Sequence, residues 1–305
     1  MSVDFGISIP QFYPEGSLDL DVLSTFVRDA ERLGFHSGWV QEEILDAPAL
    51  DAIGLLSFAA TQTTTLKLGT AILVTTVANP LYLAKSLATL DLISKGRLIV
   101  GVGLGSHTAI YPAFDVPLER RAARFGEGIR LMKRLWTGSA VEVEGEHWKL
   151  RGERMLPKPW QRPHPPVWLG GSARPALERA VRIGDGWIGG RTSVADFADH
   201  VGTLRELLAA AGRDPAAFGI AKRVYITVTA DKKRAEQRCA DWFGLVYGRP
   251  EMAQNVMTYG SEQECIEQVA AFIEAGAKLL FFNPVFDMRE QMEILATRII
   301  PALRS

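Results

Sequence analysis

Cysteine is scarce in this chain, and its scarcity bears on two kinds of site. The 305 residues include two cysteines, Cys239 and Cys265, each within an amphipathic helical pattern. We therefore expect buried free thiols rather than a disulfide or a pair of metal ligands. Four of the five histidines are scattered without the spacing of metal ligands: His36, His147, His164 and His200. The sequence thus predicts no metal centre.

Long apolar runs and a strong net charge are also missing. No apolar run is long enough to span a bilayer, and the opening Met-Ser-Val-Asp-Phe lacks the basic and apolar regions of a secretion signal. The formal net charge is −1, which leaves no electrostatic footprint for nucleic acid or an anionic membrane. We expect a cytoplasmic, enzyme-like globular protein that binds neither nucleic acid nor membranes. The sequence shows no nucleophilic-serine elbow and no catalytic triad.

The most regular pattern present is a strand, helix and strand over residues 66–105. Residues 66–74 are nearly all apolar or β-branched, as in a strand that is covered on both faces. Asn79 and Pro80 provide an N-cap and a first-turn proline, and Lys95 with Gly96 ends the helical pattern. Residues 98–102 form the second apolar strand. Two strands joined by so long a connection are parallel.

The same unit recurs along the chain about eight times. Further strands are expected at residues 5–10, 37–40, 167–169, 186–188, 220–229 and 278–283. Further helices are expected at 18–33, 48–61, 118–135, 172–183, 194–211, 230–245, 262–275 and 288–303. We expect a loop at 106–117, and residues 252–258 have no assignment. The hairpin-like and proline-rich residues 137–166 interrupt the alternation, and we expect an insertion folded over the barrel rim. The pattern predicts a single (β/α)8 TIM barrel domain over residues 1–305.

Two glycine-rich turns are candidates for an anion site. In such barrels the reactive groups follow the carboxyl ends of the strands. Gly170, Gly171 and Ser172 lie between a strand and a helix, where free N–H groups and the positive helix end meet. The alternative is an ordinary turn in which Ser172 is the N-cap. A second glycine-rich turn at residues 189–193, with Gly190 and Arg191, favours the anion site.

The segment GVGLG, residues 101–105, invites comparison with a dinucleotide-binding fold. Its spacing is G-x-G-x-G, and Ser106 stands where a third glycine belongs. Pro112 and Pro117 keep the following segment irregular, so no helix begins there. We therefore reject the dinucleotide fold, and expect that these small residues let a flat ring lie close to the backbone.

Polar residues at the other strand ends are candidates for acid–base chemistry. His107 is the one histidine at an expected strand end, although it could equally order its own loop. Glu42 and Glu43 are adjacent, so on an extended segment they point in opposite directions and form no carboxylate dyad. The remaining polar candidates at strand ends are Gln11, Gln41, Thr75, Thr76, Ser106, Lys222, Arg223 and Asn283. Lys222 beside Arg223 favours phosphate or tail binding.

Two stretches carry a resemblance to a known family. They are LGTAILV with NPLYLAKSLATLDLISKGRLIVGVGLG, and PKPWQRPHPPVWLGGSARPALERAVRIGDGW. The chain resembles the bacterial luciferase-like superfamily of flavin-type oxidoreductases, and in particular its short branch that depends on the deazaflavin coenzyme F-420. The resemblance extends from FGISIPQ to the final strand.

The resemblance implies a (β/α)8 barrel with a flavin or deazaflavin ring in its mouth, and frequently a homodimer. It implies that the ring lies against the third strand, at a non-proline cis peptide that here would be Ala71–Ile72, and that the phosphate lies near the two glycine-rich turns. The cofactor-binding residues expected on this basis are Gln41, Ala71, Ile72, Gly105, Ser106, Gly170, Gly171, Ser172, Gly190 and Arg191.

The resemblance does not carry over a proton donor. Relatives that oxidise alcohols or sugar phosphates commonly have a histidine after the second strand, where this chain has Gln41, Glu42 and Glu43. Our first hypothesis is hydride transfer between coenzyme F-420 and a small organic substrate, with His107, Glu42 or Glu43 as acid or base. The alternative within the class is an FMN-dependent monooxygenase. Outside it, a non-catalytic flavin-binding barrel and a sugar-phosphate lyase stay open.

Overall fold

Eight parallel strands close into a barrel in the computed structural model, which describes residues 3–13, 16–45, 47–105 and 108–304. The barrel strands are β1 (Asp4–Ser8), β2 (Ser37–Val40), β3 (Lys67–Thr70), β5 (Leu98–Gly103), β8 (Val167–Gly170), β9 (Gly186–Gly189), β10 (Gly219–Val228) and β12 (Leu279–Pro284). Each strand pairs in parallel with the next, and β12 returns to β1. The predicted (β/α)8 barrel is confirmed.

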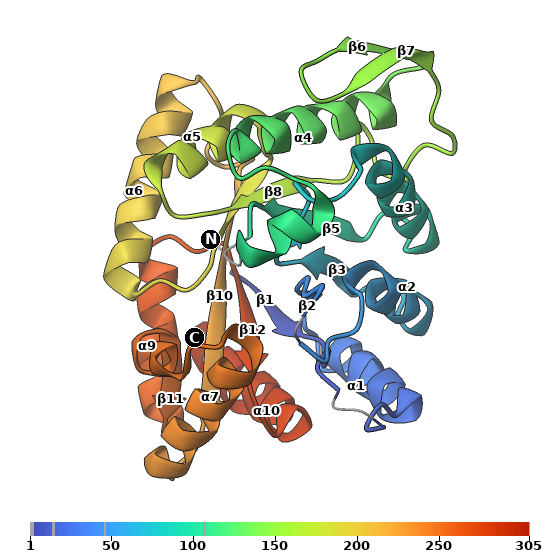
Figure 1. Cartoon of the computed structure of the whole chain (residues 1–305). Coiled ribbons are helices and arrows are strands. Elements are labelled where there is room, and N and C mark those ends of the chain that lie inside the picture. Colours follow the sequence, from blue (N-terminus) through green and yellow to red (C-terminus); the bar gives the residue numbers. More distant parts are fainter. Residues whose placement is uncertain (1–2, 14–15, 46, 106–107, 305) are drawn as a thin grey trace.

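Helices surround the barrel (Figure 1). They are α1 (Leu20–Arg32), α2 (Ala52–Gln62), α3 (Pro80–Ile93), α4 (Arg121–Thr137), α5 (Arg174–Ile183), α6 (Val194–Ala210), α7 (Lys232–Tyr247), α9 (Glu262–Glu274), α10 (Met288–Ile294), the π-helical η3 (Leu295–Ile299) and α11 (Ile300–Arg304). Within the described residues, no helix has the length and apolar character needed to cross a bilayer.

The interior of the barrel is filled by tryptophan rings. The Trp39 ring stacks on Phe281 with centroids 4.6 Å apart, and Trp168 lies 6.1 Å from Trp39. Facing positions are glycine because a larger residue would not fit: a Cβ on Gly69 would lie 2.4 Å from the Trp39 ring, and one on Gly219 would lie 2.5 Å from Trp168. A filled interior confines ligands to the ends of the barrel.

Three elements between residues 66 and 121 differ from the expectation. The apolar run is divided into β3 and a short β4 (Leu73–Val74), and the intervening Ala71–Ile72 bond is cis, as predicted. The expected loop at 106–117 contains a 3-10 helix, η1 (Thr108–Phe114). Helix α4 begins at Arg121 rather than at Leu118, because its N-cap Arg120 has a left-handed backbone with φ 61°.

The insertion at residues 137–166 lies along α3 and α4 and reaches the barrel rim at the end where the strands begin. It contains an antiparallel hairpin of β6 (Val141–Glu144) and β7 (Lys149–Glu153), which lies outside α4 (Figure 1). Glu127 of α4 accepts hydrogen bonds from the His147 and Trp148 N–H groups at 3.1 and 2.9 Å. The proline-rich part is anchored by Gln161, whose N–H donates to Asp91 of α3 at 2.9 Å. The Gln161 side-chain amide also donates to the Leu98 carbonyl, at the start of β5, at 2.8 Å, so the insertion follows α3 and α4 down to the barrel.

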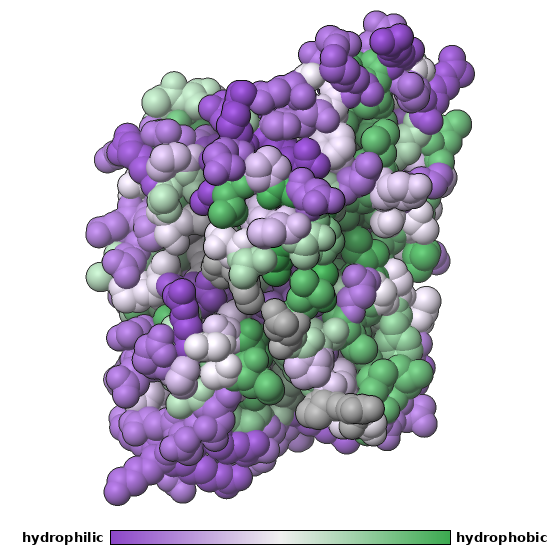
Figure 2. Space-filling model, viewed as in Figure 1, coloured by the Kyte–Doolittle hydropathy of each residue, from purple (hydrophilic) through white to green (hydrophobic). Residues whose placement is uncertain are grey.

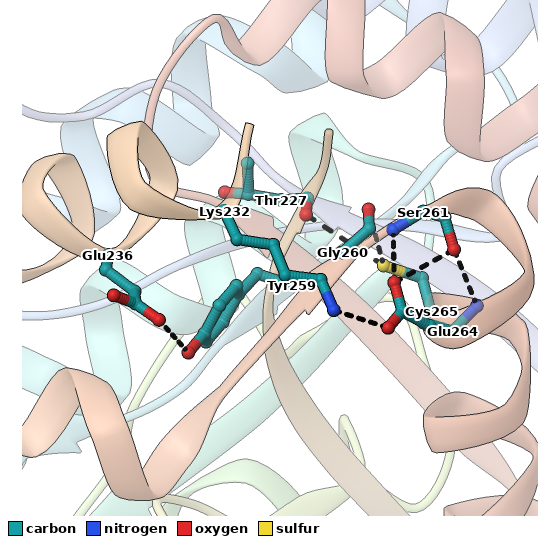
Figure 3. A network of polar contacts seen from close by, with 8 residues as sticks. All are labelled: Thr227, Lys232, Glu236, Tyr259, Gly260, Ser261, Glu264 and Cys265. Carbon is teal, nitrogen blue, oxygen red and sulfur yellow. Dashed lines mark hydrogen bonds and ion pairs between the residues drawn. The ribbon is translucent and has the colours of Figure 1, made fainter. Parts of the chain in front are cut away.

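Beyond the barrel, the unassigned stretch after α7 forms η2 (Pro250–Met252), α8 (Ala253–Val256) and β11 (Met257–Gly260), and β11 pairs with the outer end of β10. Figure 3 shows the polar contacts that fasten this addition. Lys232 of α7 pairs with Glu264 of α9 at 2.5 Å, and the Tyr259 hydroxyl donates to Glu236 at 2.8 Å. Cys265 is buried beside this network as a free thiol, and Cys239 is likewise free and buried, as expected.

Candidate functional site

The predicted site residues that the structure describes gather at one end of the barrel, where the strands end. Gln41, Glu42 and Glu43 follow β2, the Ala71–Ile72 bond lies between β3 and β4, and the two glycine-rich turns follow β8 and β9. Gly105 follows β5 with φ 74°. Two predicted residues, Ser106 and His107, lie outside the described residues. The parallel topology therefore brings together elements that are far apart in the sequence.

The GVGLG glycines make room for the chain itself, which is a further reason for small residues beside the expected approach of a ring. A Cβ on Gly101 would lie 1.8 Å from the Thr70 carbonyl oxygen, and one on Gly103 would lie 3.0 Å from the Ile72 side chain. A Cβ on Gly105 would lie 3.1 Å from Val74. The space beside this segment is thus taken by residues 70–74.

Glu42 is joined to the segment that contains the cis bond. Its backbone N–H donates to the Ile72 carbonyl at 3.2 Å, and its carboxylate accepts a hydrogen bond from the Val74 N–H. The pKa of Glu42 is raised to about 7, mainly by burial. The hydrogen bond from Val74 lowers this pKa, whereas the charges of Asp51 and Glu43 raise it. Glu42 is therefore a carboxyl group that changes protonation near neutral pH, as a general acid or base requires.

Glu43 has a different set of partners, in agreement with the expected opposite orientation. Its carboxylate accepts from the Gln41 side-chain amide at 2.6 Å. Gln41 in turn accepts from the Tyr247 hydroxyl at 3.2 Å, and Tyr247 shares a 2.9 Å hydrogen bond with Tyr225. Sequence reasoning missed both tyrosines. Strand alternation from Arg223 could have found Tyr225, whereas Tyr247, at the end of α7, gave no signal.

The turn after β8 presents an uncapped helix end. Helix α5 begins at Arg174, and its N-cap is Ala173, with no side-chain hydrogen bond, so the alternative in which Ser172 is the N-cap is wrong. Gly171 has φ 122°, and its carbonyl accepts from the Trp187 indole N–H at 2.8 Å. A Cβ there would lie 2.8 Å from the Cβ of Ala176. An exposed helix N-terminus without a side-chain acceptor suits an anion such as phosphate.

The turn after β9 differs because its helix already has a cap. Ser193 accepts from the Asp196 N–H at 3.1 Å, which also places a carboxylate in the first turn of α6. Arg191 lies over the Tyr247 ring, 4.7 Å from its centroid. Of the two turns, the one at Gly171 is the better anion site, and Arg191 is the nearby cation of the second turn.

Lys222, for which we expect phosphate or tail binding, lies on the outer side of β10. Its ammonium donates to the Gly190 carbonyl at 2.5 Å and to the Thr192 carbonyl and hydroxyl at 3.0 and 3.1 Å. Burial lowers the pKa of Lys222 to about 7, and the charge of Arg223 adds to this. Lys222 thus shapes the turn at residues 190–192 from behind, while Arg223 faces the barrel mouth.

A cavity of about 180 Å³ opens at this end of the barrel, and we call it the mouth cavity. Its lining residues are Ser8, Ile9, Pro10, Gln11, Phe12, Trp39, Val40, Gln41, Arg223, Trp242, Leu245, Asn283, Pro284, Val285 and Met288. A second hollow, of about 380 Å³, lies at the opposite end of the barrel among Asp4, His36 and Lys278. It contains none of the predicted site residues, so the mouth cavity is the candidate substrate site.

The fold and the site define a TIM-barrel enzyme whose strand ends carry an uncapped helix N-terminus and a partly buried carboxyl group. Residues 3–279 match the family model described as luciferase-like monooxygenase, and the chain belongs to that family. The expected resemblance and the expectation of an oxidoreductase of this kind are therefore confirmed. No cluster of three or more possible metal ligands occurs in the part of the chain that the structure describes.

Named relatives include enzymes that use coenzyme F-420. The chain is 27% identical to the F-420-dependent glucose-6-phosphate dehydrogenase of Kineococcus radiotolerans, over 92% of this chain and 93% of that protein. Its fold resembles an F-420-dependent secondary alcohol dehydrogenase, with TM-score 0.84, 21% identity and full coverage of both chains. It equally resembles monooxygenase RslO1 from Streptomyces bottropensis, with TM-score 0.84, 23% identity and coverage of 98% and 99%.

Proposed function

We propose that the protein is an F-420-dependent oxidoreductase that moves a hydride to or from a small organic substrate in the mouth cavity. The observation that carries the proposal is the placement of an uncapped helix end at Gly171 and a partly buried carboxyl group at Glu42 around one end of the barrel. The F-420-dependent relatives support the choice of cofactor. When bound, the deazaflavin accepts or donates the hydride.

The residues at the strand ends fit a cofactor with a flat ring and a phosphate. Gly170, Gly171 and Ser172 would hold the phosphate at the N-terminus of α5, with Gly190 and Arg191 beside them. Ala71 and Ile72 would support the ring. Gln41, Gly105 and Ser106 complete the proposed set.

Glu42 is our first choice for proton transfer. Hydride transfer to or from carbon is accompanied by gain or loss of a proton, and a well-placed side chain contributes roughly 10²–10⁴-fold. Glu42 is partly buried beside the cis segment and has a pKa of about 7, so both protonation states are available near neutral pH. Glu43 and His107 are the alternatives, and His107 stays a prediction from the sequence.

An FMN-dependent monooxygenase is the second candidate, favoured by the family description and by the likeness to RslO1. The two alternatives outside the oxidoreductases, a sugar-phosphate lyase and a non-catalytic flavin-binding barrel, have less support. A sugar-phosphate lyase would use a lysine in the mouth, and Lys222 instead donates to Gly190 and Thr192 behind it. A non-catalytic flavin-binding barrel needs no substrate cavity, and the mouth cavity provides one.

We further propose a homodimer in the cytoplasm. Hydrophobic side chains gather in Figure 2 on the side where Figure 1 places α2 and α3. On α3, Tyr82 is 79% exposed and Ile93 is 45% exposed, so an apolar face is left for a second copy. The two free, buried cysteines fit a reducing compartment.

A turnover assay with two arms tests the function. In the first arm, F-420 absorbance is followed with a panel of small alcohols, aldehydes and sugar phosphates. In the second, reduced FMN, oxygen and the same panel are supplied and oxygenated products are sought. We expect turnover in the F-420 arm alone. Oxygenation confined to the FMN arm would favour the monooxygenase instead.

A further inference from the structure

The barrel mouth contains a buried arginine that has no carboxylate partner among the described residues. Arg223 is 8% exposed, and the ion pairs of the described residues do not include it. Its Nη2 donates to the Asn283 side-chain oxygen at 2.6 Å, and its Nη1 makes a long contact of 3.5 Å with the Ala71 carbonyl. Its Nε has no hydrogen-bond partner among the described residues. Buried charges in proteins are normally paired, so this guanidinium is an exception that calls for a ligand.

The position of Arg223 on its strand directs it into the mouth cavity. Side chains alternate along β10: Ala221 belongs to the inner barrel cluster, whereas Val224 and Ile226 belong to the outer core. Arg223 is thus one step above the filled barrel interior, and it lines the mouth cavity. Its guanidinium also lies 4.7 Å from the centroid of the Tyr225 ring, which limits its movement.

The rest of the cavity has a different character. Phe12, Trp242, Leu245 and Met288 provide apolar and aromatic walls, and the lining includes no acidic side chain among the described residues. Glu42 and Glu43 accept hydrogen bonds from the Val74 N–H and the Gln41 amide respectively, and no ion pair joins either of them to Arg223 among the described residues. A ligand that fits has a small apolar or aromatic body with one anionic group.

We propose that Arg223 binds the carboxylate of the substrate, so that the enzyme acts on small organic acids with an apolar body. A guanidinium offers N–H donors in one plane that match a carboxylate, and the pair is stronger in a desolvated site. The inference rests on the proposed function, because it names the substrate class of that same site. The apolar walls and the size of about 180 Å³ favour a carboxylate on a compact body over a sugar phosphate.

The test compares two probes of equal shape, phenylacetate and phenylacetamide, by calorimetric titration of the whole protein. We expect phenylacetate to bind at least tenfold more tightly. R223M should remove that preference while leaving the weaker amide binding unchanged. N283D is a second variant, in which the new carboxylate sits beside the guanidinium Nη2 and competes with the probe. It should also weaken phenylacetate at least tenfold. R234Q, an exposed arginine of α7, is the matched control and should change nothing.

Equal affinity for the two probes, or absence of binding by both, would overturn the inference. So would a preference for phenylacetate that persists in folded N283D, which guards against a failure of R223M to fold. The same variants are titrated with F-420 to find whether the anion belongs to the cofactor. A loss of F-420 affinity in R223M, with F-420 displacing the probe, would overturn the substrate assignment. Failure of F-420 to bind wild-type protein contradicts the proposed function instead, and leaves the probe result to be judged separately.

Discussion

Two neighbouring glutamates after β2 differ because their carboxylates meet different partners. The Glu42 carboxylate accepts a hydrogen bond from the Val74 N–H, and desolvation raises its pKa to about 7. Glu43 is held by the Gln41 amide. Adjacent residues on an extended segment face opposite sides. The Glu42 carboxyl group therefore lies beside the cis segment, whereas the Glu43 carboxylate is bonded to Gln41.

E42Q should change both the pH dependence of stability and the turnover. The folded-state pKa of about 7 lies above the ordinary value of 4.5, so the folded protein binds more protons across that interval. Stability from this group is therefore present below pH 4.5 and lost as pH rises to about 7. Thermal unfolding of E42Q should lack this decline, and turnover should fall at least tenfold.

The controls for that prediction are E43Q and H107Q. We expect E43Q to lower the pKa of Glu42 slightly, because the charge of Glu43 raises it, and to keep most of the pH-dependent decline in thermal stability. Full activity in E42Q, with the pH profile of wild type, would contradict the assignment. A tenfold loss of turnover in H107Q with E42Q unaffected would transfer the proton role to His107.

At the scale of elements, helix α5 and helix α6 show that similar turns can have different uses. Both follow a barrel strand and a glycine pair, yet Ser193 caps α6 while Ala173 leaves α5 without a side-chain cap. Only the uncapped N-terminus of α5 leaves free N–H groups and a positive potential for a ligand. The proposed anion site therefore depends on the absence of a side-chain cap at the N-terminus of α5.

G171V should abolish cofactor binding in a folded protein. Gly171 has φ 122°, and a side chain there would meet the Cβ of Ala176 at 2.8 Å, so the turn must shift and the phosphate approach would be blocked. G202A, in helix α6, is the control, because a Cβ at Gly202 would meet nothing within 4 Å. Fluorescence titration with F-420 checks both variants, and circular dichroism checks the fold. Wild-type affinity in folded G171V would refute this phosphate site.

A single carboxylate fastens α1 to the start of β3. Glu31 accepts from the N–H groups of Thr64, Thr65 and Leu66 at 2.8, 2.5 and 2.8 Å. Desolvation opposes its ionisation, but the hydrogen bonds from Thr65, Leu66 and Thr64 outweigh it and lower the pKa of Glu31 to about 2.

E31Q should therefore destabilise the protein at neutral pH and less at low pH. The contribution of Glu31 is present above pH 4.5 and lost as pH falls towards about 2. Since the side chain is partly solvated, we expect a loss of about 1 kcal/mol at pH 7, measured by urea unfolding. E178Q, which removes an exposed ion pair with Arg174, should have almost no effect. Equal losses at pH 7 and pH 3 would contradict the charge-based explanation.

At the scale of the whole molecule, the sequence predicts the barrel because its periodic units repeat. Residues 66–105 already contain two parallel strands and their helix. The features that the sequence could not predict depend on which of several neighbouring residues takes a position, and on contacts between residues far apart in the chain. An apolar run does not reveal its break between Thr70 and Leu73, and Ser172 has N-cap chemistry although Ala173 takes that position.

The candidate site shows the same limit. The strand-end rule selected Gln41, Glu42 and the glycine turns, because parallel topology alone brings strand ends together. It did not select Tyr247, which reaches Gln41 from 206 positions further along the chain. Lys222 and Arg223 are neighbours in the sequence, yet strand alternation places them on opposite faces of β10.

The measurement that tests the central claim most directly is a parallel titration of the purified protein with coenzyme F-420 and with FMN, followed by fluorescence. The account predicts saturable binding of F-420, at least tenfold tighter than that of FMN, and its loss in G171V. Tighter binding of FMN, or F-420 binding that G171V leaves unchanged, would contradict it.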